Sequence, residues 1–302
     1  MTFGAIIVTF NRLDELKKTI GLYEDQTILP EYILVVDNHS TDGTPAFLEK
    51  WKTQEKSVKR MVLTLPENTG GSGGFHAGLK KAVELDADWI WVADDDAYPE
   101  MDVLQKLDDF LKSGIHPVDD ISAVCARVQR SDGIAVGHRC RHKEKIVPVE
   151  EYQKPYFELN LFSFVGSVIS KRAIRQVGLP RADFFLYSDD YEYALRLGQA
   201  GKIFCVPAAV VNHNDNADYS REASWRDYYA TRNILIVYKT YYSKLDYVWR
   251  KTKRILTAFS SFNPEKVVVF LKAMKDARLE NTGLDPIYRP GWKPKRIYRK
   301  QK

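Results

Sequence analysis

The sequence predicts an α/β fold, with a mixed, mainly parallel sheet flanked by helices and a helical C-terminal extension. Apolar segments of strand length alternate with segments of helical periodicity through the first hundred residues. This alternation is typical of parallel sheets with crossover helices. The chain has 302 residues, 44% of them hydrophobic, which suffices for one large core and a smaller appendage.

The expected elements follow from local patterns in chain order. Short runs of aliphatic and β-branched residues predict strands, at residues 4–9, 32–37, 59–65, 89–94, 121–129, 161–169 (interrupted by Gly166), 202–206 and 210–212. Apolar residues at helical spacing predict helices, at residues 12–26, 45–53 and about 75–85, from the acidic pair 189–190, and from about residue 220 onward.

Three consecutive carboxylates, Asp94, Asp95 and Asp96, end the apolar run that begins at Trp89. Adjacent carboxylates repel one another and are costly to desolvate. At the mouth of a buried strand they therefore indicate a bound divalent cation, Mg²⁺ or Mn²⁺. For such a run taken alone, a solvated acidic turn is the simpler explanation. The apolar strand that precedes it favours the metal site.

Polar or glycine-rich loops also follow the first three expected strands, at residues 9–12, 37–44 and 67–74. Ligands of parallel α/β sheets bind beyond the carboxyl ends of the strands. Together with the acidic run at 94–96, four strand ends carry polar or glycine-rich loops, which favours a nucleotide-sized pocket. Any one of these loops could be an ordinary turn. The glycines at 70–74 match neither the dinucleotide fingerprint nor the P-loop. They still allow a diphosphate or a sugar to approach backbone N–H groups at a helix start.

Two later features could complete such a site. Asp189 and Asp190 open an expected helix, where N-terminal capping alone also explains carboxylates. His213 ends a later β segment. A single histidine is more often structural than a ligand, and only a position beside the triple Asp would make it part of a metal site.

Charge is distributed unevenly along the chain. Residues 221–302 hold 20 Lys and Arg against 7 Asp and Glu, whereas residues 1–220 hold 25 against 33. The basic, aromatic-rich tail suits anionic lipid head groups or a phosphorylated substrate, and the acidic body argues against nucleic acid. Three widely spaced cysteines indicate a reducing compartment. The sequence shows neither a signal peptide nor the roughly 20 apolar residues needed to span a bilayer.

Taken together, these motifs resemble those of the inverting GT-A fold glycosyltransferases, glycosyltransferase family 2, over about the first 240 residues. The motifs concerned are residues 7–12, 35–44, 94–96 (the metal-binding D-x-D) and 189–190 (the base-bearing motif). Within that family, the segments 68–75 and 225–233 look like the corresponding segments of bacterial galactofuranosyltransferases. Tyr187-Ser188 departs from the lead-in of polymerising members, which leaves the acceptor and the product length open.

The resemblance implies a role for each motif. Asp94 and Asp96 would hold Mn²⁺ or Mg²⁺, with His213 as a further ligand. Asp190 would be the general base toward the acceptor, with Asp189 as the second choice. The residues implied in donor binding are Thr9, Phe10, Arg12, Asp37, Asn38, Asn68, Gly73, Gly74, Asp94 and Asp95. Asp37 would accept a hydrogen bond from the uracil or ribose, whereas Arg12 could also be an ordinary helix-start residue.

The function expected is metal-dependent, inverting transfer of a hexose, galactofuranose from UDP-galactofuranose, to a lipid-linked glycan. Such a step belongs to the synthesis of bacterial cell-surface polysaccharide, as in the cell wall, a capsule or O-antigen. One alternative is a rhamnosyltransferase that uses dTDP-rhamnose. Another is a glycan- or nucleotide-binding protein without catalysis. The sequence gives no oligomeric state.

Two domains are expected, a nucleotide-sugar-binding and catalytic domain at 1–219 and a basic helical region at 220–302 for acceptor or membrane contact. Residues 244–256 alternate apolar and basic side chains, which suits a helix lying on anionic lipid. A helix packed on the core with its basic face in water fits equally well. We expect a cytoplasmic protein held peripherally on the inner face of the plasma membrane.

Overall fold

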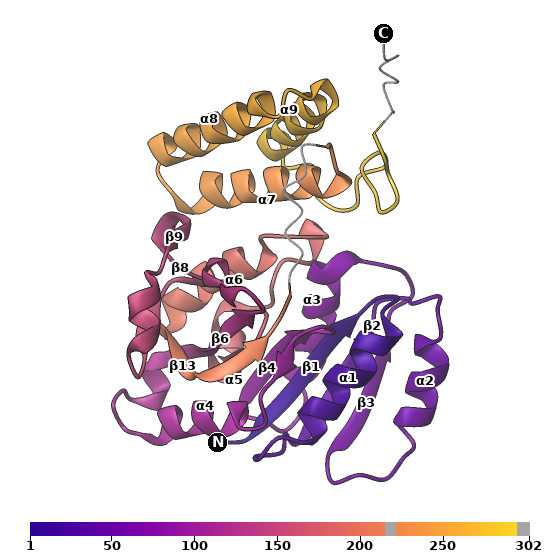
Figure 1. Cartoon of the computed structure of the whole chain (residues 1–302), viewed down its shortest axis with the longest axis vertical. Helices are drawn as coiled ribbons and strands as arrows, with labels where there is room; N and C mark the ends of the chain where they lie inside the picture. The colour runs from indigo at the N-terminus through magenta and orange to yellow at the C-terminus, as the bar shows by residue number, and fades with distance from the viewer. Residues whose placement is uncertain (215–221, 295–302) are drawn as a thin grey trace. The chain divides into compact units, whose positions relative to one another are not determined.

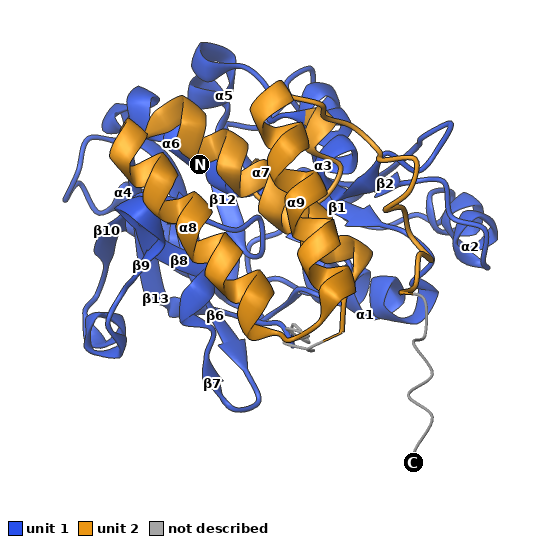
Figure 2. Cartoon of the chain, turned by 90° about the horizontal axis from the view of Figure 1, so that it is seen from above, with its two compact units in different colours: residues 1–181, 190–215 blue, residues 182–189, 216–302 orange. Residues whose placement is uncertain are grey.

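The computed structural model describes residues 1–214 and 222–294, and the chain divides into two units (Figure 2). The first unit comprises residues 1–181 and 190–215, and the second comprises 182–189 and 216–302. The second unit therefore includes a short internal segment that runs into helix α6 (Asp189–Ala200). The boundary expected at residues 219–220 lies outside the described residues.

The first unit is built on a mixed, mainly parallel sheet (Figure 1). Its main strands are β1 (Phe3–Thr9), β2 (Tyr32–Asp37), β3 (Lys59–Thr64), β4 (Trp89–Asp94), β6 (Ile121–Arg130), β10 (Phe157–Leu159), β12 (Ser167–Ser170) and β13 (Lys202–Asn212). Their order is β10-β13-β6-β12-β4-β1-β2-β3. β12 is antiparallel to both of its neighbours, whereas the β1–β2, β2–β3, β1–β4 and β6–β13 pairs are parallel. The predicted fold class is confirmed.

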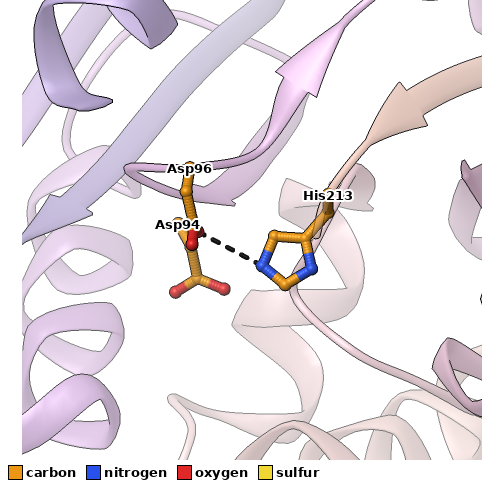
Figure 3. Close-up of side chains that lie close together, drawn as sticks. All are labelled: Asp94, Asp96 and His213. Atoms are coloured by element: carbon orange, nitrogen blue, oxygen red, sulfur yellow. Dashed lines mark ion pairs between the residues drawn. The ribbon is translucent and has the colours of Figure 1, made fainter. Parts of the chain in front are cut away.

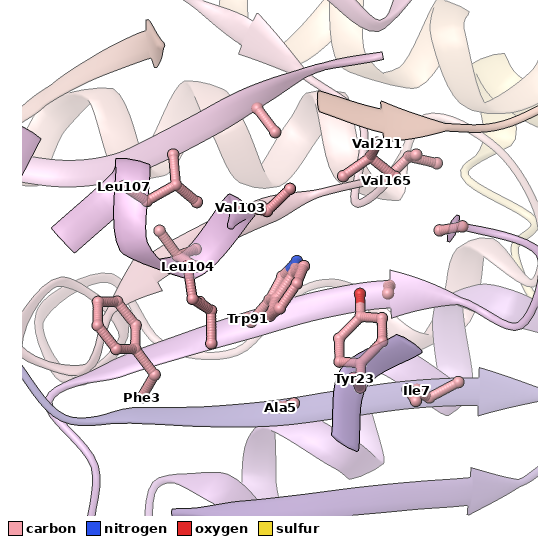
Figure 4. Close-up of a cluster of buried hydrophobic side chains, with 14 of the residues drawn as sticks. Phe3, Ala5, Ile7, Tyr23, Trp91, Val103, Leu104, Leu107, Val165 and Val211 are labelled. Atoms are coloured by element: carbon pink, nitrogen blue, oxygen red, sulfur yellow. The ribbon is translucent and has the colours of Figure 1, made fainter. Parts of the chain in front are cut away.

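Helices cover both faces of this sheet, as the near-continuous apolar character of β1, β2 and β4 requires. On one face, Phe3, Ala5 and Ile7 of β1 pack with Trp91 of β4 and with α1 (Leu13–Glu24) and α4 (Val103–Lys112) (Figure 4). The same cluster includes residues of α2 (Thr44–Trp51). The opposite face, which carries Ile6, packs with α3 (Gly70–Ala82), α5 (Lys171–Val177) and α6. Two apolar layers thus fix the sheet that carries the polar strand ends.

Helix α3 begins five residues earlier than the sequence predicts, so residues 70–74 are helical rather than a loop. Glycine is a poor helix former, but here close packing requires it. A Cβ at Gly74 would lie 2.5 Å from Val8 Cγ1, and one at Gly78 would lie 2.7 Å from Ile6 Cγ2. The glycines therefore let α3 approach β1, which overrides their local propensity.

Two further strand predictions need correction. The expected strand at 161–169 is two strands in different sheets, β11 (Leu161–Phe162) and β12, and between them the chain turns at Gly166, whose φ is +65°. β11 joins β8 (Arg139–Arg141) and β9 (Lys145–Ile146) in a small antiparallel sheet. The two expected segments 202–206 and 210–212 are one strand, β13, with an irregular register against β6 between Val206 and Val210. Two short strands, β5 (Tyr98–Pro99) and β7 (Gly133–Ile134), pair with β13 and β6.

The second unit is helical, as expected, with α7 (Trp225–Tyr241), α8 (Lys244–Ser260) and α9 (Pro264–Leu279). α7 starts with a capping box between Ser224 and Asp227, and Asn263 caps α9 ahead of Pro264. Within the described ranges 1–214 and 222–294, no helix combines the length and the apolar character that crossing a bilayer demands.

Candidate active site

The polar residues predicted to bind ligand gather at one edge of the sheet because their strands are parallel and in register. Thr9 at the end of β1 pairs with Asp37 at the end of β2, and the preceding Val8 pairs with Asp94 at the end of β4. The loops that carry these side chains therefore leave the sheet from one edge, which is where ligands of such sheets bind.

Asp94, Asp96 and His213 form a cluster suited to a metal ion. One ligand atom from each lies within 4.8 Å of the others, and the His213 ring faces the two carboxylates (Figure 3). His213 Nε2 lies 3.2 Å from Asp96 Oδ1. The antiparallel pairing of Asn212 with Tyr98 brings the end of β13 to the loop after β4. Two carboxylates and an imidazole can coordinate Mn²⁺. Of these ligands, Mg²⁺ prefers the carboxylate oxygens.

Asp95, the middle residue of the triple Asp, is buried and turned to other partners. Thr9 Oγ1 donates a hydrogen bond to Asp95 Oδ2 at 2.7 Å. Arg12 bridges two of the aspartates, with its guanidinium nitrogens 3.2 Å from Asp95 Oδ1 and 2.8 Å from Asp96 Oδ2. Arg12 therefore lies against the acidic run, and its contact with a donor stays a prediction.

Burial dominates the electrostatics of the three aspartates. It raises the pKa of Asp94 to about 6, with the charge of Asp96 adding to the effect. Burial also raises the pKa of Asp95 to about 7, although the charge of Arg12 and the hydrogen bond from Thr9 oppose it. For Asp96 burial acts upward too, but the hydrogen bond and charge of His213 and the charge of Arg12 outweigh it, so its pKa is lowered. A bound cation would add positive charge beside the two carboxyls whose pKa burial raises, and it would favour their charged forms.

Asp37 lies at the adjacent strand end and is fully buried. Its Oδ1 accepts a hydrogen bond from the N–H of Ser40 at 2.9 Å. Its buried Oδ2 has no hydrogen-bond partner among the residues that the structure describes. An unpaired buried carboxylate oxygen is costly, so this atom suits a donor group supplied by a ligand.

The loops after β1 and β2 are tied to each other. Asn11 adopts φ +54°, its Oδ1 accepts a hydrogen bond from the N–H of Thr41 at 2.6 Å, and its own N–H donates to Ser40 Oγ at 2.9 Å. Phe10 is half-buried beside Asn11. These contacts fix the backbone between Thr9 and Arg12.

The remaining predicted donor-binding residues organise the start of α3. Asn38 Nδ2 donates to the carbonyl of Gly70 at 2.8 Å and to Asn68 Oδ1 at 3.2 Å. Gly73 and Gly74 are buried inside α3, and a Cβ at Gly73 would lie 2.2 Å from Thr69 Oγ1. These hydrogen bonds and the close packing at the start of α3 give the four residues a structural role. Contact of Asn38, Asn68, Gly73 and Gly74 with a donor stays a prediction.

Asp189 and Asp190 are the first two residues of α6, where Asp189 is buried and Asp190 half-buried. Three residues just before them, Phe185, Tyr187 and Ser188, have φ values of +65°, +68° and +65°. Non-glycine residues rarely adopt this left-handed conformation, and it concentrates at functional sites.

Sequence reasoning missed one neighbour of the cluster. His138 lies edge-on to His213, with ring centroids 5.4 Å apart, and its Nδ1 lies 2.6 Å from Ser163 Oγ. The two histidines are 75 positions apart in the chain, and nothing in the local sequence around His138 marks it.

Comparisons with known proteins find similar sequences and similar folds. The galactofuranosyltransferase GlfT1 of Mycobacterium tuberculosis is 26% identical over 219 residues, which cover 69% of this chain and 69% of that protein. Two solved structures share the fold at low identity. GalNAc-T7 with UDP, GalNAc and Mn²⁺ matches with a TM-score of 0.63 and 14% identity, over 93% of this chain and 56% of that one. The mannosyltransferase PcManGT from Pyrobaculum calidifontis, in complex with GDP-Man and Mn²⁺, matches with a TM-score of 0.59 and 15% identity. The match covers 92% of this chain and 75% of that one.

The model of the family described as glycosyl transferase family 2 matches residues 5–178. This range contains most of β1, all of β2 to β4 and the triple Asp, and it makes up more than half of the chain. The relatives and the topology of the sheet with its acidic strand end all indicate this family. The chain therefore belongs to glycosyl transferase family 2 and is a glycosyltransferase of the GT-A fold, similar to galactofuranosyltransferases.

Proposed function

We propose that this enzyme transfers galactofuranose from UDP-galactofuranose, with inversion, to a lipid-linked glycan in the synthesis of a bacterial cell-surface polysaccharide. The observation that carries the proposal is the cluster of Asp94, Asp96 and His213 at the carboxyl edge of the sheet. Similarity to GlfT1 supports galactofuranose as the sugar. The second candidate, transfer from dTDP-rhamnose, uses the same cluster and is separated by the assay described below.

In this proposal Asp94, Asp96 and His213 hold Mn²⁺ or Mg²⁺. When bound there, such an ion supplies Lewis-acid neutralisation of the diphosphate leaving group. Arg12 is partly exposed next to the cluster, and its guanidinium offers hydrogen bonds and positive charge to diphosphate oxygens. Asp37 Oδ2 accepts a hydrogen bond from the base or the ribose of the nucleotide. Thr9 keeps Asp95 in place beside Arg12.

Inversion requires the acceptor hydroxyl to attack the sugar opposite the leaving group while a carboxylate takes its proton. We assign this role to Asp190, with Asp189 as the second choice, because both stand where an unusual backbone conformation leads into α6. A positioned general base contributes roughly 10²- to 10⁴-fold to the rate. Asp190→Asn, which keeps the shape of the side chain, should lower the rate by at least about 100-fold.

The assay is release of UDP or dTDP from the two donors with water as acceptor, in Mn²⁺ and in EDTA. We expect UDP-galactofuranose to be turned over in Mn²⁺, and EDTA, Asp94→Asn and Asp96→Asn each to abolish turnover. Asp86→Asn is the matched control, because Asp86 is exposed before β4. Turnover of dTDP-rhamnose alone would refute the galactofuranose assignment, and absence of turnover with either donor would favour a binding protein.

A lipid-linked acceptor implies contact with a membrane surface, and α8 offers a suitable face. Its apolar stripe is exposed, with Leu245 at 82% and Trp249 at 68% of their full accessibility. The stripe consists of Leu245, Val248, Trp249, Leu256 and Phe259. These positions share one side of a helix. The stripe is flanked by Lys251 and Lys253, an arrangement that suits anionic lipid.

Two arginines of α8 turn the other way. Arg254 Nη2 donates to the carbonyl of Ala230 in α7 at 3.2 Å, and the Arg250 guanidinium lies 5.3 Å from the ring centroid of Tyr238. α8 thus packs on α7 through the side opposite its apolar stripe, and the exposure of the stripe supports a membrane role over a helix that presents only basic residues to water. We propose that this stripe seats the enzyme on the anionic inner face of the plasma membrane.

A further inference from the structure

The segment before the proposed base is held by two buried polar residues of α7, Arg232 and Asn233. Both side chains are fully buried. The Asn233 Nδ2 atom lies 2.9, 2.8 and 2.9 Å from the carbonyl oxygens of Phe184, Leu186 and Tyr187. A single amide group is thus hydrogen-bonded to three main-chain carbonyls within four consecutive residues.

Arg232 fixes the orientation of that amide. Its Nε donates a hydrogen bond to Asn233 Oδ1 at 2.8 Å, so the Asn233 nitrogen faces the carbonyls. Its Nη2 donates to the carbonyl of Phe184 at 2.9 Å, and its Nη1 donates to that of Gly283 at 2.8 Å. The guanidinium lies about 5 Å from the ring centroids of Tyr228 and Tyr229, which leaves it little freedom to turn.

The backbone held in this way is one that the segment would not adopt alone. Phe185, Tyr187 and Ser188 all have left-handed φ values, and such conformations persist where the surroundings fix them. Without the Asn233 amide, the carbonyls that it binds would lose a buried donor. The chain continues from Ser188 directly into Asp189 and Asp190, so this conformation belongs to the backbone that leads into the proposed base.

We propose that Asn233, oriented by Arg232, is a positioning residue that fixes residues 184–188 and thereby places the carboxylate that takes the acceptor's proton. The inference rests on the proposed role of Asp190, or of Asp189, as the base. A displacement of about 1 Å at a reacting group can cost on the order of 100-fold in rate. The contribution of Asn233 should therefore appear in turnover and not in donor affinity.

The test is a double-mutant cycle with Asp190→Asn and Asn233→Ala, followed by UDP release from UDP-galactofuranose in Mn²⁺ with water as acceptor. Asn233→Ala should lower kcat at least about 10-fold, with the affinity for UDP and Mn²⁺ changed less than twofold. In the Asp190→Asn background it should cause no further loss, because the two residues act through one group. The acidic limb of the pH–rate profile should weaken in both single variants.

Tyr228→Phe is the matched control for a structural effect in the same unit. It removes the 2.7 Å hydrogen bond to Asp276 and keeps the ring next to Arg232, so it should lower the melting temperature while kcat and the pH profile stay as in the wild type. If Asn233→Ala does not fold, Asn233→Ser, which keeps a short donor, carries the same cycle.

Three results would overturn the inference: additive losses in the cycle, loss of donor affinity in parallel with kcat, or wild-type kcat in Asn233→Ala. Failure of the proposed function looks different. If both Asp190→Asn and Asp189→Asn retained full activity, neither carboxylate would be the base, whatever Asn233 does.

Discussion

At the level of single residues, the buried charge of Asp94 lowers the stability of the metal-free protein. Burial raises its pKa to about 6, so between about pH 4 and 6 the folded protein binds more protons there than the unfolded chain. Stability from this group therefore falls as the pH rises through that window, and the penalty is complete at pH 7.5. The carboxylate is kept at a cost in folding free energy, which is typical of functional sites.

Asp94→Asn should therefore stabilise the metal-free protein at pH 7.5, by on the order of 1 kcal/mol, since each pKa unit corresponds to about 1.4 kcal/mol and the side chain is only partly buried. At pH 4 the gain should vanish, because the wild-type carboxyl is then protonated. Urea unfolding in EDTA at both pH values measures this. Equal stability of variant and wild type at pH 7.5 would contradict the burial of the charge.

Metal binding should depend on the same protons. Mn²⁺ must displace the proton of Asp94, a ligand whose pKa burial raises to about 6. The dissociation constant for Mn²⁺ should therefore rise as the pH falls from 8 to 5, approaching tenfold per unit below about pH 6. Calorimetric titration at several pH values checks this. A constant affinity over that range would mean that the ion does not bind at these carboxyls.

At the level of elements, the sequence predicted β1, β2, β4 and β6 closely, misplaced the start of α3 and merged β11 with β12. Apolar runs and turn residues mark parallel strands, and both are local signals. The start of α3 could not be predicted because the need for glycine at position 74 comes from its contact with Val8 of β1, which no local pattern shows. Likewise Gly166 separates two strands of different sheets, and which sheet a two-residue strand joins is decided by tertiary packing.

The contact between α3 and β1 can be tested with a pair of glycine substitutions. Gly74→Ala should destabilise the protein by roughly 1–3 kcal/mol, the usual cost of overpacking, because its Cβ would meet Val8 Cγ1 at 2.5 Å. Gly71→Ala, in the same helix, meets nothing within 4 Å and should be neutral or stabilising by up to about 1 kcal/mol. Thermal unfolding compares the two variants. The packing explanation fails if they behave alike.

At the scale of the whole molecule, the site was predictable as far as parallel strands determine it. The ends of β1, β2 and β4 lie at one edge by topology, so Thr9, Asp37 and Asp94 could be grouped from the sequence. The place of His213 depends on the two-residue strand β5, which has no sequence signal, and the resemblance supplied that ligand. The support of residues 184–187 by Arg232 and Asn233 joins segments almost fifty positions apart and was not predictable.

The opposite charges of body and tail suit an enzyme that meets anionic lipid through its tail. The wild-type protein should co-sediment with vesicles containing phosphatidylglycerol, less so with purely zwitterionic vesicles, and less in 0.5 M NaCl. Trp249→Ser with Leu256→Ser should weaken binding more than about 10-fold, since each buried apolar side chain contributes roughly 1.5–3 kcal/mol. Met101→Ser, at another exposed apolar position, is the control. Unchanged binding, or a monomer–dimer change without lipid binding, would refute the membrane role of α8.

The most direct test of the central claim is the anomalous diffraction of crystals grown with Mn²⁺ and UDP. We expect one manganese peak within coordination distance of Asp94, Asp96 and His213, with the diphosphate of UDP next to the ion. A peak elsewhere, or UDP bound with these three side chains remote from both ion and diphosphate, would contradict it.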